Sequence, residues 1–450
     1  MNDAMFTRFE GCSDIGRIRD VVTVRPNLIR ELGDSDALVS AEVLADTLKQ
    51  IYLPNQFSLE FIKEMIDKAS LYCRKMFESE AAYLSRVYCP PEVEVAPFCL
   101  TGLAGIGKSQ TIAALRKVLP KPVDFTADHF EGVHQLVSYW YASARGKAGG
   151  RQLLLDFLHD DVGKTRSNVA KLLVECRRRA NRDGVSLLML EETQHINTGQ
   201  GVSRVTDILL TMAAIGPPMV YVSNYSLVHK LLGRNSEDKQ RLLAEPRIML
   251  PDAPDSEAWR DYMSECVRVC NGHLDVNFDD FVEEMYRSTF GIKRLAVQLI
   301  KLAYIEARAS GRKSISLADV HRAYLSVAYS ANRGDLEELH RQALQNRNTG
   351  SRLDLRCPFD LPISLKSNVV QFVRSDRDNR VIDKIFHASL NEGERSAIEE
   401  IESSVPGATA KPSKPAKRPR IPKATDDELI SAFHQVLESM GPPPKPKRPK

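Results

Sequence analysis

Apolar runs and helical patterns alternate through the middle of this 450-residue chain. Short apolar runs, each bounded by polar or turn residues, predict strands at 98–100, 135–141, 186–190 and 219–223. A helix is expected directly after the first of them, at 110–118. Because strands that alternate with helices are typical of a parallel sheet covered by helices, the pattern predicts an α/β core over residues 93–254.

The pattern becomes wholly helical after Ala253 and Pro254. Helices are expected at 257–270, 278–289, 293–310 and 316–331. The third is apolar over a broad face, as expected of a helix packed among others. A small helical domain over residues 255–334 should therefore follow the α/β core.

The two ends of the chain are less regular. Residues 1–92 are predicted to be a mainly helical module, with helices near 40–51 and 59–77. Residues 335–405 form an extension of unknown fold, with a possible strand at 368–373. The last part, 406–450, holds ten of the 24 prolines, and from Lys411 onward it has ten basic and four acidic residues. Such a composition cannot bury enough apolar surface to fold alone, so we expect a disordered basic tail in a chain of net charge +3.

One short amphipathic helix, 425–440, is predicted within this tail. Thr425 to Glu428 form a capping box, and Gly441 followed by Pro442 ends the helix. Its apolar face consists of Leu429, Ile430, Phe433, Val436, Leu437 and Met440. A helix of this length between flexible linkers cannot bury that face alone. We expect it to bind a groove on a partner, with docking onto its own chain as the alternative.

Composition excludes several classes of protein. No apolar run approaches the roughly 20 residues needed to cross a bilayer, and the first residues lack the features of a signal peptide, so we expect a cytoplasmic protein that does not contact membranes. The eight cysteines lack paired CxxC spacing. Cys266, Cys270 and His273 are close in sequence, but a structural zinc site needs four ligands. We expect the cysteines to be helix-packing residues and free thiols.

The strongest chemical signal is the segment GLAGIGKS, from Gly102 to Ser109. It matches GxxxxGK[ST] between a predicted strand and a predicted helix, which is a P-loop. Its glycines let backbone N–H groups surround phosphate oxygens, and the helix directs its positive end at the anion. Lys108 would reach the β and γ phosphates while Ser109 coordinates Mg²⁺. The expected nucleotide-binding residues are Gly102, Gly105, Ile106, Gly107, Lys108, Ser109 and Gln110.

Two carboxylates, Glu191 and Glu192, end the apolar run 186–190. This is a Walker B arrangement, which supplies a carboxylate near Mg²⁺ and a group that activates water. Because side chains alternate along a strand, Glu191 would face Mg²⁺ through its water shell while Glu192 faces the γ-phosphate. The alternative is a strand that ends in solvated acids.

Three further residues, in their order along the chain, give residues 90–335 a resemblance to the AAA+ superfamily of ATPases. Asn224 ends the run 219–223 and resembles sensor 1, although it could simply begin a turn. Arg294 opens the helix 293–310 and resembles sensor 2 of the AAA+ lid. Arg247 lies where these proteins carry an arginine finger, with Arg241 as the competing choice; either could be a surface charge.

More narrowly, residues 190–196, LEETQHI, are similar to the DExQH variant of Walker B in the TnsC/TniB family of transposition regulators. The segment 291–296, GIKRLA, is similar to that family's lid. Glu191 stands where the family usually has aspartate, and the longer side chain either loosens Mg²⁺ coordination and slows hydrolysis or is harmless. We assign Gln194 and His195 no catalytic role, since both could hold the strand end in place.

The resemblance implies an ATP- and Mg²⁺-dependent homo-oligomer, a ring or a filament, on double-stranded DNA. It would receive a signal from a target-selection protein, recruit transposase subunits and be disassembled by hydrolysis. The tail helix would contact an endonuclease subunit of the transposase. Arg145, Lys147 and Arg151 are candidate DNA contacts, mainly to phosphate, or belong to a merely solvated loop.

Two other functions fit the same sequence. A helicase loader or replication initiator would also be a DNA-bound AAA+ ATPase, and a DNA-binding helix-turn-helix after the lid would favour it. A nucleotide-gated signalling scaffold would use the same ATP site without binding DNA. Both remain alternatives to a transposition regulator.

Overall fold

The computed structural model describes residues 4–29, 32, 36–93, 95–127, 130–147, 149–158, 168–196, 201–345, 352–391, 393–394 and 396. The described residues up to Glu394 belong to one compact unit. The predicted tail, 406–450, and its helix at 425–440 lie outside the described residues.

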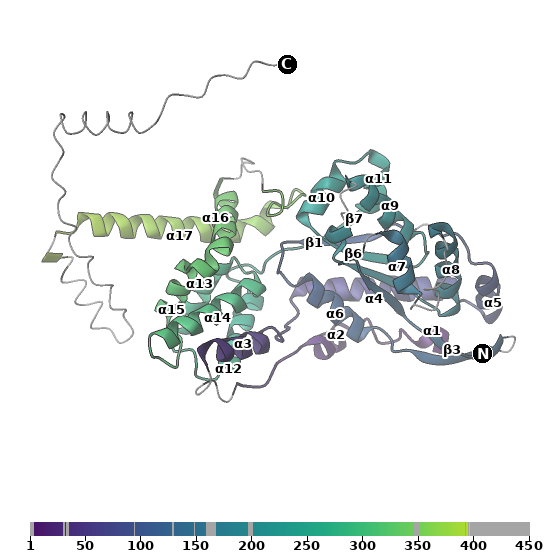
Figure 1. The fold of residues 1–450 in the computed structure, drawn as a ribbon, viewed down its shortest axis with the longest axis horizontal. Coiled ribbons are helices and arrows are strands. Elements are labelled where there is room, and N and C mark those ends of the chain that lie inside the picture. Colours follow the sequence, from purple (N-terminus) through teal and green to yellow (C-terminus); the bar gives the residue numbers. More distant parts are fainter. Residues whose placement is uncertain are drawn as a thin grey trace, which may run out of the picture. The chain divides into compact units, whose positions relative to one another are not determined.

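A five-stranded parallel sheet forms the centre of this unit, as predicted (Figure 1). In spatial order its strands are β4 (Tyr139–Ser143), β5 (Leu187–Glu191), β6 (Met219–Asn224), β1 (Phe98–Gly102) and β7 (Glu245–Met249). Every residue of β1 and β5 is buried, as expected of parallel strands covered on both faces. Gly102, at the end of β1, lies opposite Asn224 of β6 and Met249 of β7.

Helices cover both faces of the sheet. One face packs on α2 (Ile15–Val22), α4 (Gln56–Met76) and α6 (Lys108–Val118). The other packs on α7 (Gly150–Phe157), α8 (Val169–Arg182), α9 (Gly201–Ala213), α10 (Tyr225–Leu232) and α11 (Ser236–Leu242). Successive side chains of β1 point to opposite faces of the sheet. Phe98 and Leu100 pack in the core beneath α2, α4 and α6, whereas Cys99 packs in the core on the other face.

The predicted strand 135–141 is wrong, because it joins two separate strands. β2 (Val123–Ala127) and β3 (Phe130–Leu136) form an antiparallel pair outside the main sheet, and the chain then bends before β4. At the bend, the buried hydroxyl of Ser138 donates to the carbonyl of Pro120 at 2.6 Å. Residues on both sides of Ser138 are apolar, so the hydrophobic pattern runs through the bend without a break.

The edge strand β7 was not predicted from the sequence. Only Met249 at its end is buried, and its interior holds Pro246 and Arg247. Proline and charged residues are usual on edge strands but weaken the apolar pattern by which strands are recognised.

The first 88 residues contribute helices to two different cores. Besides α2 and α4 they form α1 (Ala4–Thr7), α3 (Ala37–Leu48) and α5 (Glu80–Tyr88). α3 packs on the helical domain, where Leu44 and Leu48 share a core with Leu299 and Ile300. α3 is thereby brought next to the P-loop, although about 60 residues separate the two in sequence.

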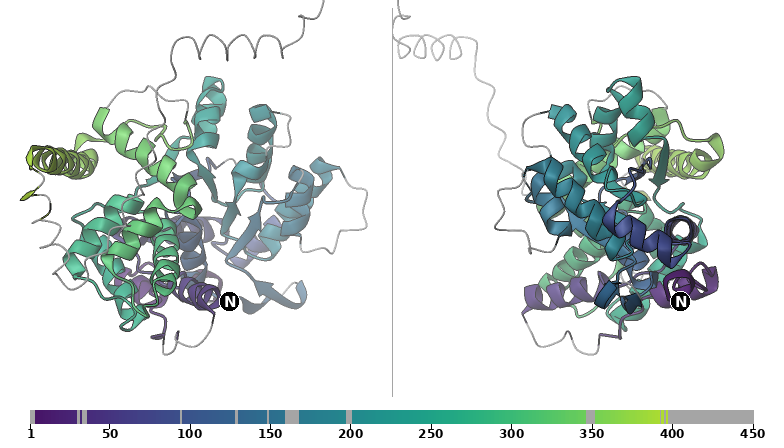
Figure 2. Two further views of the ribbon diagram at one scale, coloured as in Figure 1. Left: turned by 60° about the vertical axis from the view of Figure 1, so that its left-hand side comes forward. Right: turned by 90° about the vertical axis from the view of Figure 1, so that its right-hand side faces the viewer.

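The lid consists of α12 (Glu257–Cys270), α13 (Phe278–Thr289), α14 (Lys293–Ala309), α15 (Leu317–Leu325), the 3₁₀ turn η2 (Val327–Tyr329) and α16 (Ser330–Gln345). The first three match the predicted helices closely. The fourth predicted helix ends early, at Leu325, and α16 begins five residues later. Figure 2 shows these helices gathered beside the sheet.

The possible strand at 368–373 is wrong, because these residues lie in the long helix α17 (Ile363–Ser389). Val373 is buried in the lid core, and Val369 and Phe372 pack against it. Their spacing of three and four residues is that of one helical face.

The remaining expectations concern metals and membranes. Cys266 and Cys270 are buried in the lid core, and among the described residues no group of three or more His, Cys, Asp and Glu side chains could hold a metal ion. None of the described helices combines the length and apolar character that crossing a membrane requires.

Candidate nucleotide-binding site

The P-loop connects β1 to α6, and two of its glycines are required by close contacts. A Cβ on Gly102 would lie 2.4 Å from the backbone carbonyl oxygen of Met249 on β7. Gly105 has a φ of 81°, and a Cβ there would lie 2.6 Å from Nε of Arg294. The amide of Arg294 also donates to the carbonyl of Gly105 at 3.3 Å. Glycine at 105 therefore allows the lid arginine to lie directly on the P-loop.

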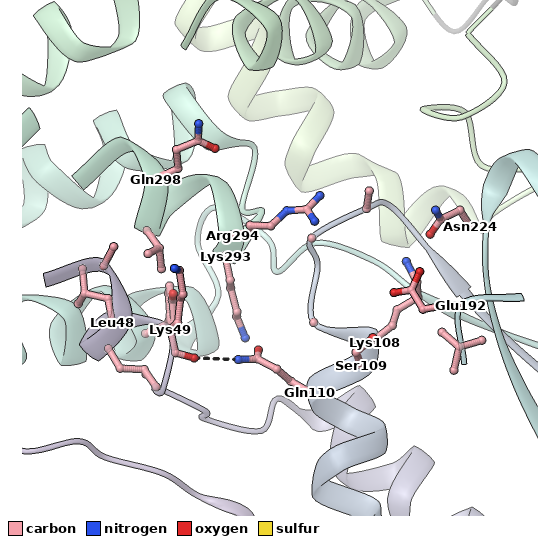
Figure 3. Close-up of a pocket in the computed structure, with 18 of the residues that line it drawn as sticks. Leu48, Lys49, Lys108, Ser109, Gln110, Glu192, Asn224, Lys293, Arg294 and Gln298 are labelled. Carbon is pink, nitrogen blue, oxygen red and sulfur yellow. Dashed lines mark hydrogen bonds between the residues drawn. The ribbon is translucent and has the colours of Figure 1, made fainter. Parts of the chain in front are cut away.

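A pocket of about 730 Å³ opens between the P-loop, α3 and the lid (Figure 3). Its size is within the usual range for small-molecule sites. The predicted site residues that line it are Gly105, Gly107, Lys108, Ser109, Gln110, Arg145, Glu192, Asn224 and Arg294. Gly102, Ile106, Glu191 and Arg247 do not line it, and neither do Lys147 and Arg151. Residues from the P-loop, β6, α6 and α14, and Glu192 just after β5, thus converge on one cavity.

Lys108 is buried in this pocket, with 7% of its surface exposed. Its ammonium group donates to the carbonyls of Gly102, at 2.8 Å, and Leu103, at 2.7 Å. Burial, and after it the positive charge of Arg294, lowers the pKa of Lys108 to about 8. Phosphate oxygens would supply the negative charge that this buried cation favours.

We expect ATP affinity to fall as the pH rises through about 8. The pKa of Lys108 is lowered in the folded protein, so part of the lysine is neutral above this pH. A bound triphosphate favours the charged form, so binding takes up a proton in this range. Calorimetry at pH 8.5 in buffers of different ionisation enthalpy measures that uptake. Proton release, or an affinity that is constant from pH 7 to 9.5, would contradict the assignment.

The two Walker B carboxylates point in different directions. Glu192 lines the pocket, whereas Glu191 is 8% exposed and lies outside it. The hydroxyl of Tyr141 donates to Oε2 of Glu191 at 2.7 Å. Burial, and then this bond, raises the pKa of Tyr141 to about 12, so the phenol remains a donor.

The donors present fit a hydrated Mg²⁺ ion. Oε1 of Glu191 is buried and has no hydrogen-bond partner among the described residues. An unpaired buried carboxylate oxygen is costly, and a water molecule of a hydrated cation would satisfy it. Ser109 is exposed in the pocket at the start of α6. Ser109 directly, and Glu191 through water, are therefore suitable ligands.

Replacing Tyr141 with phenylalanine should destabilise the protein by about 1–3 kcal/mol, the cost of leaving a buried acceptor unpaired. Neither oxygen of Glu191 would then receive a protein hydrogen bond from the described residues. Urea unfolding with and without Mg·ATP measures the loss and its expected partial recovery on binding. Tyr139→Phe, on the same strand, is the matched control. Equal unfolding free energies for the two variants would refute this role of Tyr141.

Asn224 and Arg294 lie at the phosphate end of the pocket. Asn224 is the N-cap residue of α10, yet its side chain makes no capping hydrogen bond, which argues against a simple turn-forming role. In Figure 3 its amide lies near Glu192, and Arg294 extends over the P-loop toward it. Arg294 is exposed and forms no ion pair within the described part of the chain. Both side chains therefore line the same pocket as the P-loop, and their contact with a γ-phosphate remains a prediction.

The opposite end of the pocket is formed by residues that sequence reasoning missed. Ala45, Leu48 and Ile51 form an apolar wall with Val297 of α14. On the P-loop side, Gln110 Nε2 donates to the carbonyl of Lys49 at 3.2 Å (Figure 3). This surface suits a planar base. No local signal in the sequence connects α3 with the P-loop, because only tertiary packing brings them together.

Lys293 also lines the pocket and was not predicted. Its ammonium group lies 3.2 Å from Asp252 and over the ring of Tyr262, 5.3 Å from the centroid. Lys293 directly precedes Arg294, and this position is the feature of the sequence from which its place in the pocket could have been predicted.

Arg247, the candidate finger, forms an ion pair outside the pocket. Its Nε donates to Glu64 of α4 at 2.8 Å, and Nη2 donates to Glu245 at 3.0 Å. The competing Arg241 lies 3.1 Å from Glu237. A finger acts on the site of a neighbouring subunit, so both assignments remain predictions.

The three candidate DNA contacts have different surroundings. Arg145 is exposed and lines the nucleotide pocket. Lys147 pairs with Asp156 at 2.8 Å, and Arg151 lies in the first turn of α7. Their contact with DNA remains a prediction. Because Arg145 lines the pocket, a bound nucleotide is a second candidate ligand for this residue.

The chain matches no protein-family model and no curated protein. Among solved structures, the ORC1 protein of Aeropyrum pernix in complex with DNA is 17% identical, with a TM-score of 0.38 over 61% of this chain and 73% of that one. The Holliday junction branch migration motor RuvB of Thermotoga maritima is 12% identical, with a TM-score of 0.32 over 64% and 76%. A Walker-type ATPase of Pyrococcus abyssi is 15% identical, with a TM-score of 0.36 over 61% and 77%.

All three TM-scores are below 0.5, so the assignment of the fold rests on the chain's own sheet and site. The strand order is β4-β5-β6-β1-β7, and the P-loop follows β1 at the carboxyl edge. The acidic strand β5 and the Asn224 strand β6 lie on one side of β1, and a helical lid comes later in the sequence. The described core is an α/β fold of AAA+ type.

Proposed function

We propose that this protein is an ATP-dependent regulator of DNA transposition that assembles on double-stranded DNA. The observation that carries the ATPase part is one pocket that unites Lys108, Glu192, Asn224 and Arg294. The transposition part rests on the resemblance of residues 190–196 and 291–296 to the TnsC/TniB family.

The site supports hydrolysis of ATP. Lys108 and Arg294 would hold the β and γ phosphates, while Asn224 orients the attacking water and Glu192 accepts its proton. Mg²⁺, bound by Ser109 and through water by Glu191, would neutralise charge on the phosphate oxygens. The exposed Arg294 would also make the position of the lid depend on the nucleotide, because the γ-phosphate is present only in ATP.

Assembly would link this chemistry to DNA. An arginine finger from a neighbouring subunit, Arg247 or Arg241, would tie ATP binding to a ring or filament. Arg145, Lys147, Arg151 and the basic tail would contact DNA phosphates. The tail helix would bind transposase subunits, and a target-selection protein would determine where assembly begins.

ATP hydrolysis with and without duplex DNA, together with electron microscopy of the ATP-bound protein on DNA, tests the proposal. We expect DNA to stimulate hydrolysis and ATP, but not ADP, to support ordered assemblies. If a transposase gene lies beside the gene for this protein, its product should be recruited to these assemblies. If DNA produced neither stimulation nor assembly, the proposal would fail and a scaffold independent of DNA would be favoured. Recruitment of a helicase instead of a transposase would favour a loader.

A further inference from the structure

The backbone at Glu192 has an unusual conformation. Three described residues other than glycine have positive φ: Glu192 at 56°, Asn271 at 45° and Phe290 at 54°. Asn271 and Phe290 are C-caps of α12 and α13, where this conformation is common. Glu192 instead lies between β5 and the 3₁₀ turn η1 (Thr193–Ile196). A left-handed residue away from a helix end is costly and is typical of functional sites.

The side chain of Glu192 is held by Gln194 and His195, two residues whose sequence context assigns them no catalytic role. Nε2 of Gln194 donates to Oε2 of Glu192 at 2.6 Å. Nε2 of His195 lies 3.2 Å from the same oxygen. Both contacts are to one oxygen, the first a hydrogen bond and the second at ion-pair distance, and Oε1 receives no hydrogen bond from the described residues. All three side chains line the nucleotide pocket.

Holding the strand end in place does not require these two side chains. The hydroxyl of Thr193 donates to the carbonyl of Val222 on β6 at 2.7 Å, in a buried bond. Ile196 is 1% exposed and packs in the core beneath. Thr193 and Ile196 therefore anchor η1, while Gln194 is only half-buried and the side chain of His195 is 51% exposed.

We infer that Gln194 and His195 are positioning residues that orient the carboxylate of Glu192 toward the attacking water. A glutamate side chain has three rotatable bonds and, at 36% exposure, several accessible rotamers. The hydrogen bond from Gln194 and the close contact of His195, both at Oε2, favour one of these rotamers and leave Oε1 to accept the water proton. This inference rests on the proposed ATPase activity and adds two residues to its site.

The test compares single-turnover hydrolysis, ATP affinity and stability among variants of the full chain. Gln194→Leu removes a donor at similar volume and should lower the rate of hydrolysis about tenfold, as loss of a hydrogen bond to a charged group implies. ATP affinity and the unfolding midpoint should not change. His195→Ala should lower the rate about threefold, less than Gln194→Leu, because His195 only lies 3.2 Å from Oε2 and does not form a hydrogen bond to it, whereas His195→Gln keeps a polar group beside Oε2 and should retain most of the rate.

Gln342→Leu is the matched control, because Gln342 donates to Glu338 at 2.8 Å in α16, outside the pocket. Wild-type rates for both Gln194→Leu and His195→Ala would overturn the inference, as would equal losses in His195→Ala and His195→Gln. These rates are measured without DNA, so they are independent of assembly. Failure of the wild-type protein to assemble on DNA would refute the proposed function and leave the positioning role intact.

Discussion

Lys108→Ala should lower ATP affinity at least about 100-fold, since it removes charge-assisted hydrogen bonds to two phosphates, each contributing about 1.5–3 kcal/mol. Hydrolysis and any ATP-dependent assembly on DNA should be lost with it. Figure 3 shows Lys108 at the start of α6, where the P-loop ends. Equilibrium binding of a fluorescent ATP analogue measures the affinity.

The same substitution should not destabilise the nucleotide-free protein by more than about 1 kcal/mol. The pKa of Lys108 is lowered by burial and by Arg294, so the folded state disfavours the charged lysine relative to the unfolded chain. Removing that charge offsets the lost bonds to Gly102 and Leu103. Lys117→Ala, at an exposed position of α6, controls for loss of a lysine. ATP binding that survives in Lys108→Ala would refute the site.

Glu192→Gln should lower the rate of hydrolysis by about 10² to 10⁴, the usual contribution of a general base, while ATP still binds. The amide keeps the size of the side chain but cannot accept a proton from water. Assemblies on DNA should then persist in ATP, because the step that ends them is slow. Single-turnover hydrolysis and the lifetime of DNA-bound protein after dilution measure the two effects.

Glu175→Gln, at an exposed position of α8, is the control for this change. A normal rate of hydrolysis in Glu192→Gln would contradict this prediction and would show that Glu192 is not the general base. Short-lived assemblies in spite of slow hydrolysis would separate disassembly from ATP cleavage and contradict the proposed cycle.

Lys108, Glu192 and Asn224 line one pocket, and their proximity could be predicted because they stand at or just beyond the ends of buried strands. In a parallel sheet these ends meet at one edge, so the order of Lys108, Glu192 and Asn224 along the chain implies their proximity. The lid helices could also be predicted from the sequence, since α12, α13 and α14 have strong amphipathic patterns and clear ends.

Features that depend on tertiary contacts could not be predicted from the sequence. Residues 135–141 are largely apolar, so nothing local marked the bend at Ser138. Residues 368–373 resemble a strand in isolation, but one face of the segment packs against the lid in a helix. The contacts of Gln194 and His195 with Glu192 accompany a left-handed backbone at Glu192, which no local pattern indicates at a residue other than glycine.

The apolar wall from α3 has a practical consequence for dissecting this protein. A fragment that begins at residue 93 would retain the P-loop, the Walker B strand and both sensor positions, and it would look complete by its motifs. It would lack Ala45, Leu48 and Ile51 of the pocket and would expose the face of α14 on which α3 packs. We therefore expect that the nucleotide-binding core is not a separable module, and that a minimal soluble fragment that keeps the whole pocket must include α3.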